Sequence, residues 1–186
     1  MFRRLLAAAL SVLTLTALGG VVGAAPAAAA LPPGGQWSPY YRIVAQHSGK
    51  CLDVAWRGTH DGADVIQANC NYDLATNANQ LWRVYYPGHI GGFAYYVAKH
   101  SGKCLDVAWG SFDNGADILQ SLCGGAGAGG NQRWQRVDAG GVWFALRAEH
   151  SYKCMEVAWA STAHTANVVQ NACYAVAHQR WRLELA

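Results

Sequence analysis

The chain has 186 residues, of which 13% are charged, and it contains 8 Trp, 9 Tyr and 21 Gly. The formal net charge of +3 at pH 7 is too small for the strong basic stripe of most nucleic-acid-binding proteins, and it argues against charge-driven binding to an anionic membrane surface. Few charges, many aromatic residues and many turn formers favour a compact all-β protein over a disordered or helical one.

Residues 1–30 have the pattern of a secretory signal peptide. A short basic start is followed by a mostly apolar run to Val22 and by three small residues at 28–30, which a signal peptidase accepts. A membrane anchor is the alternative, and the small residues directly after the apolar run argue against it. Cleavage after Ala30 would lower the net charge to about +1 and leave residues 31–186 as one domain, with no second apolar stretch long enough to span a membrane.

The sequence after residue 31 consists of three copies of one repeat. The segment HSGKCLDVAW at 47–56 recurs unchanged at 100–109 and as HSYKCMEVAW at 150–159. In each repeat a second Cys follows the Trp, and a Gln-x-Trp motif comes later. We call the repeats units one, two and three, and they span approximately residues 37–89, 90–139 and 140–186.

Each unit contains four short strand-like runs separated by turn residues. In unit one these runs are 42–45, 51–54 and 64–67, with a fourth that begins at Gln80. An open stack of three such units would leave exposed sheet edges and uncapped ends, whereas a closed threefold arrangement removes most of them. The predicted fold class is therefore all-β, a β-trefoil of three four-stranded repeats.

Six cysteines in a secreted chain predict disulfide bonds, although six allow fifteen pairings. The two Cys of each unit occupy equivalent positions, so one bond within each unit is predicted: Cys51–Cys70, Cys104–Cys123 and Cys154–Cys173. Each bond should contribute roughly 3 kcal/mol by the chain-entropy model. A zinc site is the alternative, which the long spacing and an oxidising compartment disfavour. We expect no metal and no other cofactor.

The sequence lacks the common catalytic motifs, such as His-Glu-x-x-His, Gly-x-Ser-x-Gly and a phosphate-binding glycine loop. His-Ser pairs at 47–48, 100–101 and 150–151 could suggest a base and a nucleophile. A structural role is favoured because the pair recurs in the same turn of every unit. The acidic segments 61–64 and 113–117 fit no calcium-loop pattern. We expect no catalytic residues and no enzyme activity.

The three Gln-x-Trp motifs at 80–82, 132–134 and 179–181, each after a Cys-Leu-Asp-Val type of strand, resemble the ricin B-type lectin family. The resemblance covers about residues 37–186. It implies a β-trefoil that binds carbohydrate, often galactose or xylose units. The Trp of each motif is expected in the core near the threefold axis, and the Gln is expected to hydrogen-bond nearby backbone groups.

The resemblance also implies a sugar pocket in units one and two. A carboxylate from Cys-x-Asp would accept two adjacent sugar hydroxyls, and the Asn before Gln-x-Trp would supply an amide. Because side chains alternate along a strand, Asp53 is expected to face away from Leu52 and Val54. Holding the turn is the alternative role of the Asp. The candidate residues of the two pockets are Asp53, Asn79 and Gln80 in unit one and Asp106, Asn131 and Gln132 in unit two. Further candidate contacts, for which a structural role stays open, are Gln67 and Gln120.

Unit three departs from the pattern, because Glu156 stands in place of Asp and His178 in place of Asn. One extra methylene moves the carboxylate by about a bond length, so we expect this site to be inactive or altered. Family sites commonly carry a stacking Trp or Tyr two residues before the second Cys. These positions are Ala68, Ser121 and Asn171 here, and none of them can stack.

Other aromatic residues could replace the missing ones. Tyr72 follows the second Cys of unit one, and Trp56 and Trp109 each follow the site carboxylate by three residues, as Trp159 does in unit three. These Trp residues either wall the pockets or pack beneath the loop, and the sequence leaves both arrangements open.

The sequence therefore predicts a secreted, non-enzymatic protein that binds sugar units of polysaccharides or glycans through up to two shallow pockets acting together. Galactose- or xylose-containing carbohydrate is the expected partner. The alternative is a trefoil that has lost sugar binding and contacts or inhibits a protein partner, and a secreted hydrolase is the least favoured function. Nucleic acid is excluded as a partner, and so is a membrane after signal cleavage.

Overall fold

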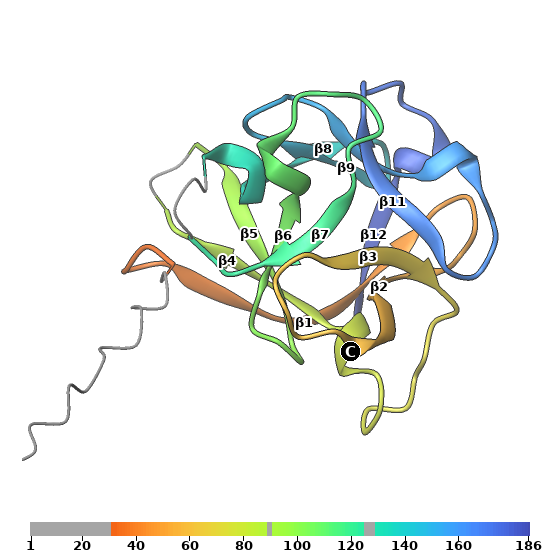
Figure 1. Ribbon diagram of the computed structural model, residues 1–186, viewed down its shortest axis with the longest axis horizontal. Helices are drawn as coiled ribbons and strands as arrows, with labels where there is room; N and C mark the ends of the chain where they lie inside the picture. Colours follow the sequence, from red (N-terminus) through yellow and green to blue (C-terminus); the bar gives the residue numbers. More distant parts are fainter. Residues whose placement is uncertain (1–30, 89–90, 125–128) are drawn as a thin grey trace, which may run out of the picture.

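The computed structural model describes residues 31–88, 91–124 and 129–186 (Figure 1). The predicted signal peptide, residues 1–30, lies outside the described residues, so the proposed domain start at residue 31 stays a prediction. The described chain forms twelve strands and six single 3₁₀ turns. The strands are β1 (Gln36–Ala45), β2 (Cys51–Val54), β3 (Ala63–Ala68), β4 (Trp82–Tyr86), β5 (Phe93–Ala98), β6 (Cys104–Val107), β7 (Ile118–Ser121), β8 (Trp134–Asp138), β9 (Phe144–Ala148), β10 (Cys154–Val157), β11 (Ala166–Asn171) and β12 (Trp181–Leu185). The turns are η1 (Ala55–Arg57), η2 (Ala78–Gln80), η3 (Ala108–Gly110), η4 (Gly130–Gln132), η5 (Ala158–Ala160) and η6 (Ala177–Gln179).

Six of the strands form a closed barrel, and the other six form three hairpins that cap it. Strand β1 pairs with β4, β4 with β5, β5 with β8, β8 with β9, β9 with β12, and β12 with β1, so these six strands close a ring. The other six form the hairpins β2–β3, β6–β7 and β10–β11, and β3 also pairs with β7 and β11. Figure 1 shows the chain passing once around the molecule, from unit one in orange and yellow to unit three in blue. Closure of the ring removes the exposed edges of an open stack, and the predicted β-trefoil is confirmed.

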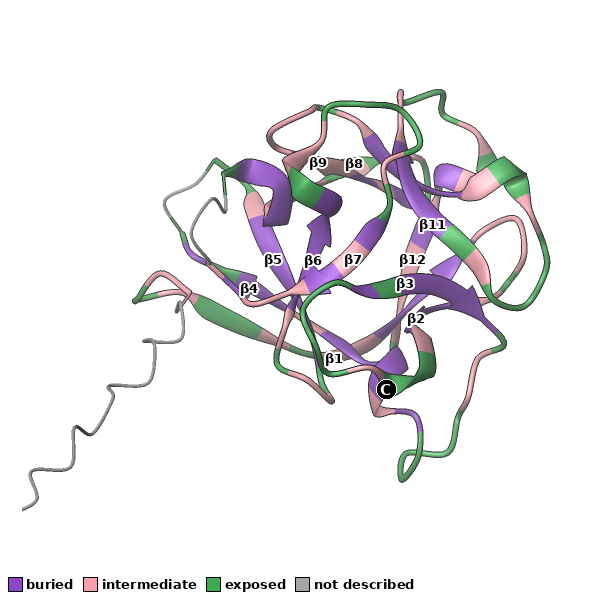
Figure 2. Ribbon diagram, viewed as in Figure 1, coloured by how far each residue is buried: buried purple, intermediate pink, exposed green. Residues whose placement is uncertain are grey.

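The three Trp residues of the Gln-x-Trp motifs lie in the core, as predicted. Trp82, Trp134 and Trp181 are among the largest fully buried side chains. Figure 2 shows buried residues, in purple, along much of the strands β3, β5 and β6. Each indole N–H donates a hydrogen bond to a backbone carbonyl of the same unit, at 3.2, 3.0 and 3.1 Å respectively. The accepting carbonyls belong to the residue just before each candidate carboxylate: Leu52, Leu105 and Met155. In each unit, the indole of the buried Trp therefore anchors the strand that carries the candidate carboxylate.

A repeated polar contact joins each unit to its neighbour. The buried amide of Gln67 donates to the carbonyls of Ser161 and Ala163, at 2.7 and 2.8 Å, and its oxygen accepts the hydroxyl of Ser48 at 2.7 Å. His47 contacts the same Ser161 carbonyl at 2.9 Å. Gln120 and Gln170 repeat this arrangement around the ring. The His and Ser of each turn thus bind different partners, as expected for structural residues.

The predicted disulfide pairs are confirmed. Cys51–Cys70, Cys104–Cys123 and Cys154–Cys173 each close a loop with a sequence separation of 19 residues. Three disulfides in one small domain are consistent with an oxidising, extracellular location. Within the described residues, no helix is long and apolar enough to cross a lipid bilayer.

Candidate functional site

The carboxylate of unit one is held by two side-chain amides. Asp53 lies on β2 between the fully buried Leu52 and Val54 and is itself only 6% exposed. The amide of Asn79 donates to Asp53 Oδ1 at 2.8 Å, and the amide of Gln80 donates to Oδ2 at 2.7 Å. Each carboxylate oxygen therefore keeps one lone-pair direction for a further donor. Asp53 does alternate away from the core, as predicted, but it lies deeper than a simple surface residue. We call this group site one.

Unit two repeats the arrangement and forms site two. Asn131 donates to Asp106 Oδ1 at 2.8 Å, and Gln132 donates to Oδ2 at 2.6 Å. Burial raises the pKa of Asp106, and the hydrogen bonds from Gln132 and Asn131 partly offset that rise. Burial raises the pKa of Asp53 in the same way, against hydrogen bonds from Gln80 and Asn79. The carboxylates are therefore positioned acceptors whose ionised form depends on their amide partners.

Unit three keeps the two-amide arrangement by a different route, and we call it site three. Gln179 donates to Glu156 Oε2 at 2.7 Å, as its equivalents do. The second amide comes from Asn171 on β11, which donates to Glu156 Oε1 at 3.0 Å. His178 occupies the position of the missing Asn, with Nε2 at 3.7 Å from Glu156 Oε2. The longer Glu side chain has thus exchanged one amide partner for another, and an imidazole lies beside it.

A hollow of about 680 Å³ opens at site three. Its lining residues come from units two and three and include Asp117, Glu156, Trp159, Asn171, Tyr174 and His178. Two aromatic rings, two carboxylates and several amides around one concave space are the ingredients of a sugar site. The sequence carries only an indirect signal for this site. Glu156 and His178 replace the Asp and Asn of the other units, and only the structure shows that Asn171 supplies the second amide.

The Trp residues that follow each carboxylate point into solvent. Trp56, Trp109 and Trp159 are 93%, 100% and 97% exposed, so packing beneath the loop is excluded. Their backbones are left-handed, with φ of 55°, 57° and 58°. A bulky residue with positive φ is an uncommon conformation, and here it reverses the alternation that would have turned the ring toward the core. Each Trp is the middle residue of the 3₁₀ turn that follows the strand carrying its site carboxylate.

Each carboxylate also faces an apolar residue on the next strand and then a residue of the neighbouring unit. These rows follow from the strand register. They consist of Asp53, Ile66 and Asn167 in site one; Asp106, Leu119 and Asp64 in site two; and Glu156, Val169 and Asp117 in site three. Every site is therefore built from two units.

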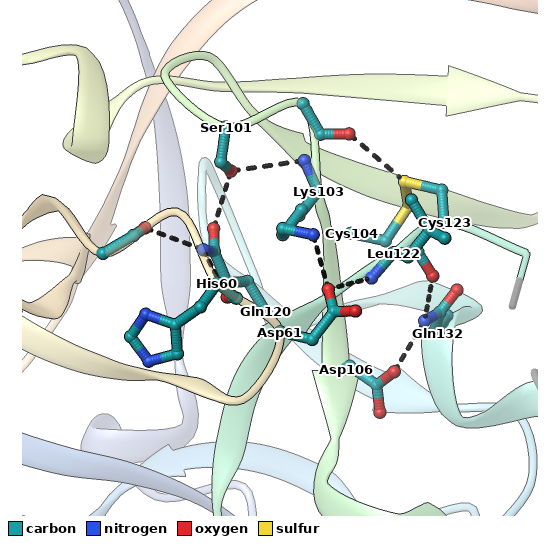
Figure 3. A network of polar contacts seen from close by, with 12 residues as sticks. His60, Asp61, Ser101, Lys103, Cys104, Asp106, Gln120, Leu122, Cys123 and Gln132 are labelled. Carbon is teal, nitrogen blue, oxygen red and sulfur yellow. Dashed lines mark hydrogen bonds and ion pairs between the residues drawn. A yellow bond between two sulfur atoms is a disulfide. The ribbon is translucent and has the colours of Figure 1, made fainter. Parts of the chain in front are cut away.

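Figure 3 shows how the loop of unit one reaches site two. Asp61 accepts a hydrogen bond from the backbone N–H of Leu122 at 2.9 Å and contacts Lys103 Nζ at 2.5 Å. The hydrogen bond from Lys103 lowers the pKa of Asp61. Gln132 lies beyond Leu122, where it links the Leu122 carbonyl at 3.0 Å to Asp106 (Figure 3). The neighbouring unit therefore contributes both charge and support to the site.

Four of the predicted sugar contacts are glutamines whose side chains are buried and engaged within the protein. Gln67 and Gln120 are fully buried, and their amides are engaged by carbonyls of the neighbouring unit, so they cannot reach a ligand. Gln80 and Gln132 are also buried and act by bracing the carboxylate and nearby backbone groups. Tyr72 is exposed, and the guanidinium of Arg42 lies 4.5 Å from its ring centroid.

Among the described residues, no group of three or more His, Cys, Asp or Glu side chains could hold a metal ion. The disulfides account for all six cysteines. The polar chemistry of the three sites is therefore that of hydrogen-bond acceptors and donors beside aromatic rings.

Comparison with known proteins identifies the family of the chain. The family model for the ricin-type beta-trefoil lectin domain matches residues 39–181. No curated protein matches the chain.

Three solved structures illustrate the likeness. The designed threefold-symmetric protein ThreeFoil is 42% identical, with a TM-score of 0.70 over 77% of this chain and 96% of that one. The exo-beta-1,3-galactanase from Clostridium thermocellum is 27% identical, with a TM-score of 0.72, and the match covers 84% of this chain but 31% of the galactanase. The Macrolepiota procera ricin B-like lectin, solved in complex with lactose, is 16% identical, with a TM-score of 0.64 over 81% of this chain and 99% of the lectin, and shows the fold.

Proposed function

The chain belongs to the ricin-type β-trefoil lectin family, and from that premise we propose that it is a secreted, non-enzymatic protein that binds galactose- or xylose-containing polysaccharides or glycans. One observation carries the proposal: in every unit a carboxylate held by two amides lies three residues before an exposed Trp. The exposed Trp rings bury almost no surface, so packing in the core does not account for them.

The geometry suits a neutral sugar ring. Two adjacent hydroxyls would donate to the two oxygens of Asp53 or Asp106, each of which has one lone-pair direction left. The amides of Asn79 and Asn131 keep these carboxylates oriented. The exposed Trp offers a flat surface for the C–H face of the sugar, in place of the aromatic residues missing at positions 68 and 121.

Site three extends the proposal beyond the two pockets predicted from the sequence. It has the hollow of about 680 Å³, and its carboxylate keeps two amide partners. Trp159 and Tyr174 both line it. Three weak sites on one rigid domain would retain a polymer better than any single site, because a second contact forms at a high effective concentration.

Two solved neighbours point to β-galactosides as the first ligands to test. The Macrolepiota procera lectin was solved with lactose, and the galactanase acts on β-1,3-galactan according to its name. The alternative role, contact with a protein partner, was motivated by the missing stacking residues. The exposed Trp residues weaken that motive, because they provide stacking surfaces at each site.

The proposal is tested by retention on immobilised β-1,3-galactan and xylan. The triple variant Asp53→Asn, Asp106→Asn and Glu156→Gln removes the three carboxylates with little change in volume. We expect the wild type to be retarded on at least one polymer and the variant to elute with the void. A matched control is Asp138→Asn, since Asp138 is exposed and caps only the backbone N–H of Gly140. Equal retention of the triple variant would show that the carboxylates do not form the sites, and a wild type that binds neither these polymers nor a glycan array would favour the protein-contact role.

A further inference from the structure

In units two and three, the residue directly after the exposed Trp borders the site of its own unit. In unit three this residue is Ala160, which lines the hollow. In unit two it is Gly110, where an added Cβ would lie 3.9 Å from Cγ of the site amide Asn131. The equivalent residue of unit one is Arg57. The three units therefore differ in charge at an equivalent position, which borders the site in units two and three.

Arg57 holds this position at a conformational cost. Its φ is 56°, whereas Gly110 and Ala160 have φ of 60° and 51° in the same turn. A long side chain with positive φ is uncommon outside sites where the surrounding structure or function requires it. The guanidinium reaches from η1 to the loop before η2, where Nη1 donates to the carbonyl of Thr76. Because a guanidinium carries five N–H donors in a planar fork, this one bond leaves donors for a ligand.

The opposite side of site one is also less acidic than in the other two sites. The last residue of its row is the neutral Asn167, whereas the equivalent residues are Asp64 in site two and Asp117 in site three. At the site mouth, His164 accepts the backbone N–H of Asn69 at 3.2 Å. The equivalent acceptor in site two is the carboxylate of Asp61.

We propose that site one selects sugars that carry an anionic group, a carboxylate or a sulfate ester, and that sites two and three take neutral sugars. The inference rests on the proposed lectin function and adds the ligand class of each site. In site one the sugar hydroxyls would bind Asp53, while the anionic group would pair with the guanidinium of Arg57. The planar fork matches the two oxygens of either anion.

The carboxylates near Arg57 have other partners, so its guanidinium is not committed to any of them. Asp53 faces its two amides, and Asp73 uses both oxygens within its own loop, accepting from the N–H of Ala75 and the hydroxyl of Thr76, each at 3.0 Å. Asp64 belongs to the row of site two. In sites two and three a second carboxylate lies two strands from the first, about 10 Å across the sheet. An anionic ligand there would meet like charge on both sides and no arginine on the wall.

The test uses the full mature chain with only site one intact, that is, Asp106→Asn combined with Glu156→Gln. Calorimetric titration compares a neutral galacto-oligosaccharide with an oligogalacturonate and a sulfated galacto-oligosaccharide of equal length. We expect at least one acidic probe to bind roughly tenfold more tightly than the neutral one at low salt, and this preference to fall as salt rises. The probe with the larger preference identifies the anion.

Two substitutions already present in the chain's own repeats provide the matched variants. Arg57→Ala copies unit three and Arg57→Gly copies unit two, and each should reduce the acidic-to-neutral ratio to about one. The control Arg136→Ala removes an exposed arginine of β8 and should leave the ratio unchanged. Equal affinity for acidic and neutral probes, or a preference that persists in both Arg57 variants, would overturn the proposal. Binding of the neutral sugar by the wild type tests the lectin function separately. If neither the wild type nor any variant binds any of the probes, both proposals are wrong.

Discussion

Replacing an exposed Trp by glycine should separate stability from binding. Trp56 has a left-handed backbone with φ of 55° and a side chain that is 93% exposed. A left-handed conformation costs an L-residue about 1–2 kcal/mol, while glycine adds about 0.5–1 kcal/mol of unfolded-state entropy. Little buried surface is lost with the ring. The free energy of unfolding of Trp56→Gly should therefore equal that of the wild type or exceed it by up to about 1.5 kcal/mol.

The core Trp of the same unit provides the contrast. Trp82 is fully buried and donates its indole N–H to the Leu52 carbonyl, so Trp82→Ala should destabilise the protein by about 3–5 kcal/mol. Urea denaturation followed by circular dichroism measures both variants. In the protein with site one alone intact, Trp56→Gly should weaken sugar binding by roughly three- to tenfold, the worth of one aromatic contact. A destabilisation of Trp56→Gly beyond about 1 kcal/mol, or unchanged binding, would refute the stacking role.

Three further predictions follow from the site and its supports. Because burial raises the pKa of Asp53 and Asp106 above the ordinary value of 3.8, sugar binding should disappear on acidification with a midpoint above pH 3.8, as a pH series of titrations would show. A raised pKa also means that ionisation opposes folding, so the contribution of these two groups to the unfolding free energy should decrease as pH rises through the raised pKa, and a flat profile there would contradict the assignment. Gln132→Ala should lower the unfolding free energy by about 2–4 kcal/mol and remove binding at site two, because Asp106 and two backbone groups lose a buried partner; denaturation and titration together check this, and a loss of binding at unchanged stability would point to direct ligand contact instead. Replacing Cys104 and Cys123 by Ala should cost about 3 kcal/mol in thermal or urea unfolding, and a loss below about 1 kcal/mol would show that the loop is held by other contacts.

The fold was accessible from the sequence because the repeat appears at every level. Identical spacing of the two Cys and the Trp between them, followed in every unit by a Gln-x-Trp motif, predicts the strand count and the disulfide pairs. The strand alternation around Asp53 predicts that its side chain lies opposite those of Leu52 and Val54. The orientation of Trp56 was not accessible in this way. Positive φ at a Trp breaks the alternation on which the argument depends, and sequence patterns do not signal it.

Site three shows a second limit of reasoning from one sequence. Asn171 pairs across the hairpin with Cys154, two residues from Glu156 on the same face of β10. The carboxylate of Glu156 accepts the amide of that diagonal neighbour. Units one and two have Ala68 and Ser121 at the equivalent position, neither of which carries an amide. A motif comparison compares one position at a time, so it reports two losses where the three-dimensional arrangement has exchanged one amide for another.

The most direct test of the account is an NMR titration of the indole N–H groups. The chain contains 8 Trp, and each should give one side-chain signal in a ¹H–¹⁵N spectrum, assigned by single Trp→Phe variants. Addition of a galacto-oligosaccharide should shift the signals of the exposed residues Trp56, Trp109 and Trp159, and leave those of the buried Trp82, Trp134 and Trp181 in place. Saturable binding that shifts none of the three exposed indoles would contradict the claim that each trefoil unit pairs its carboxylate with a solvent-facing Trp to bind sugar.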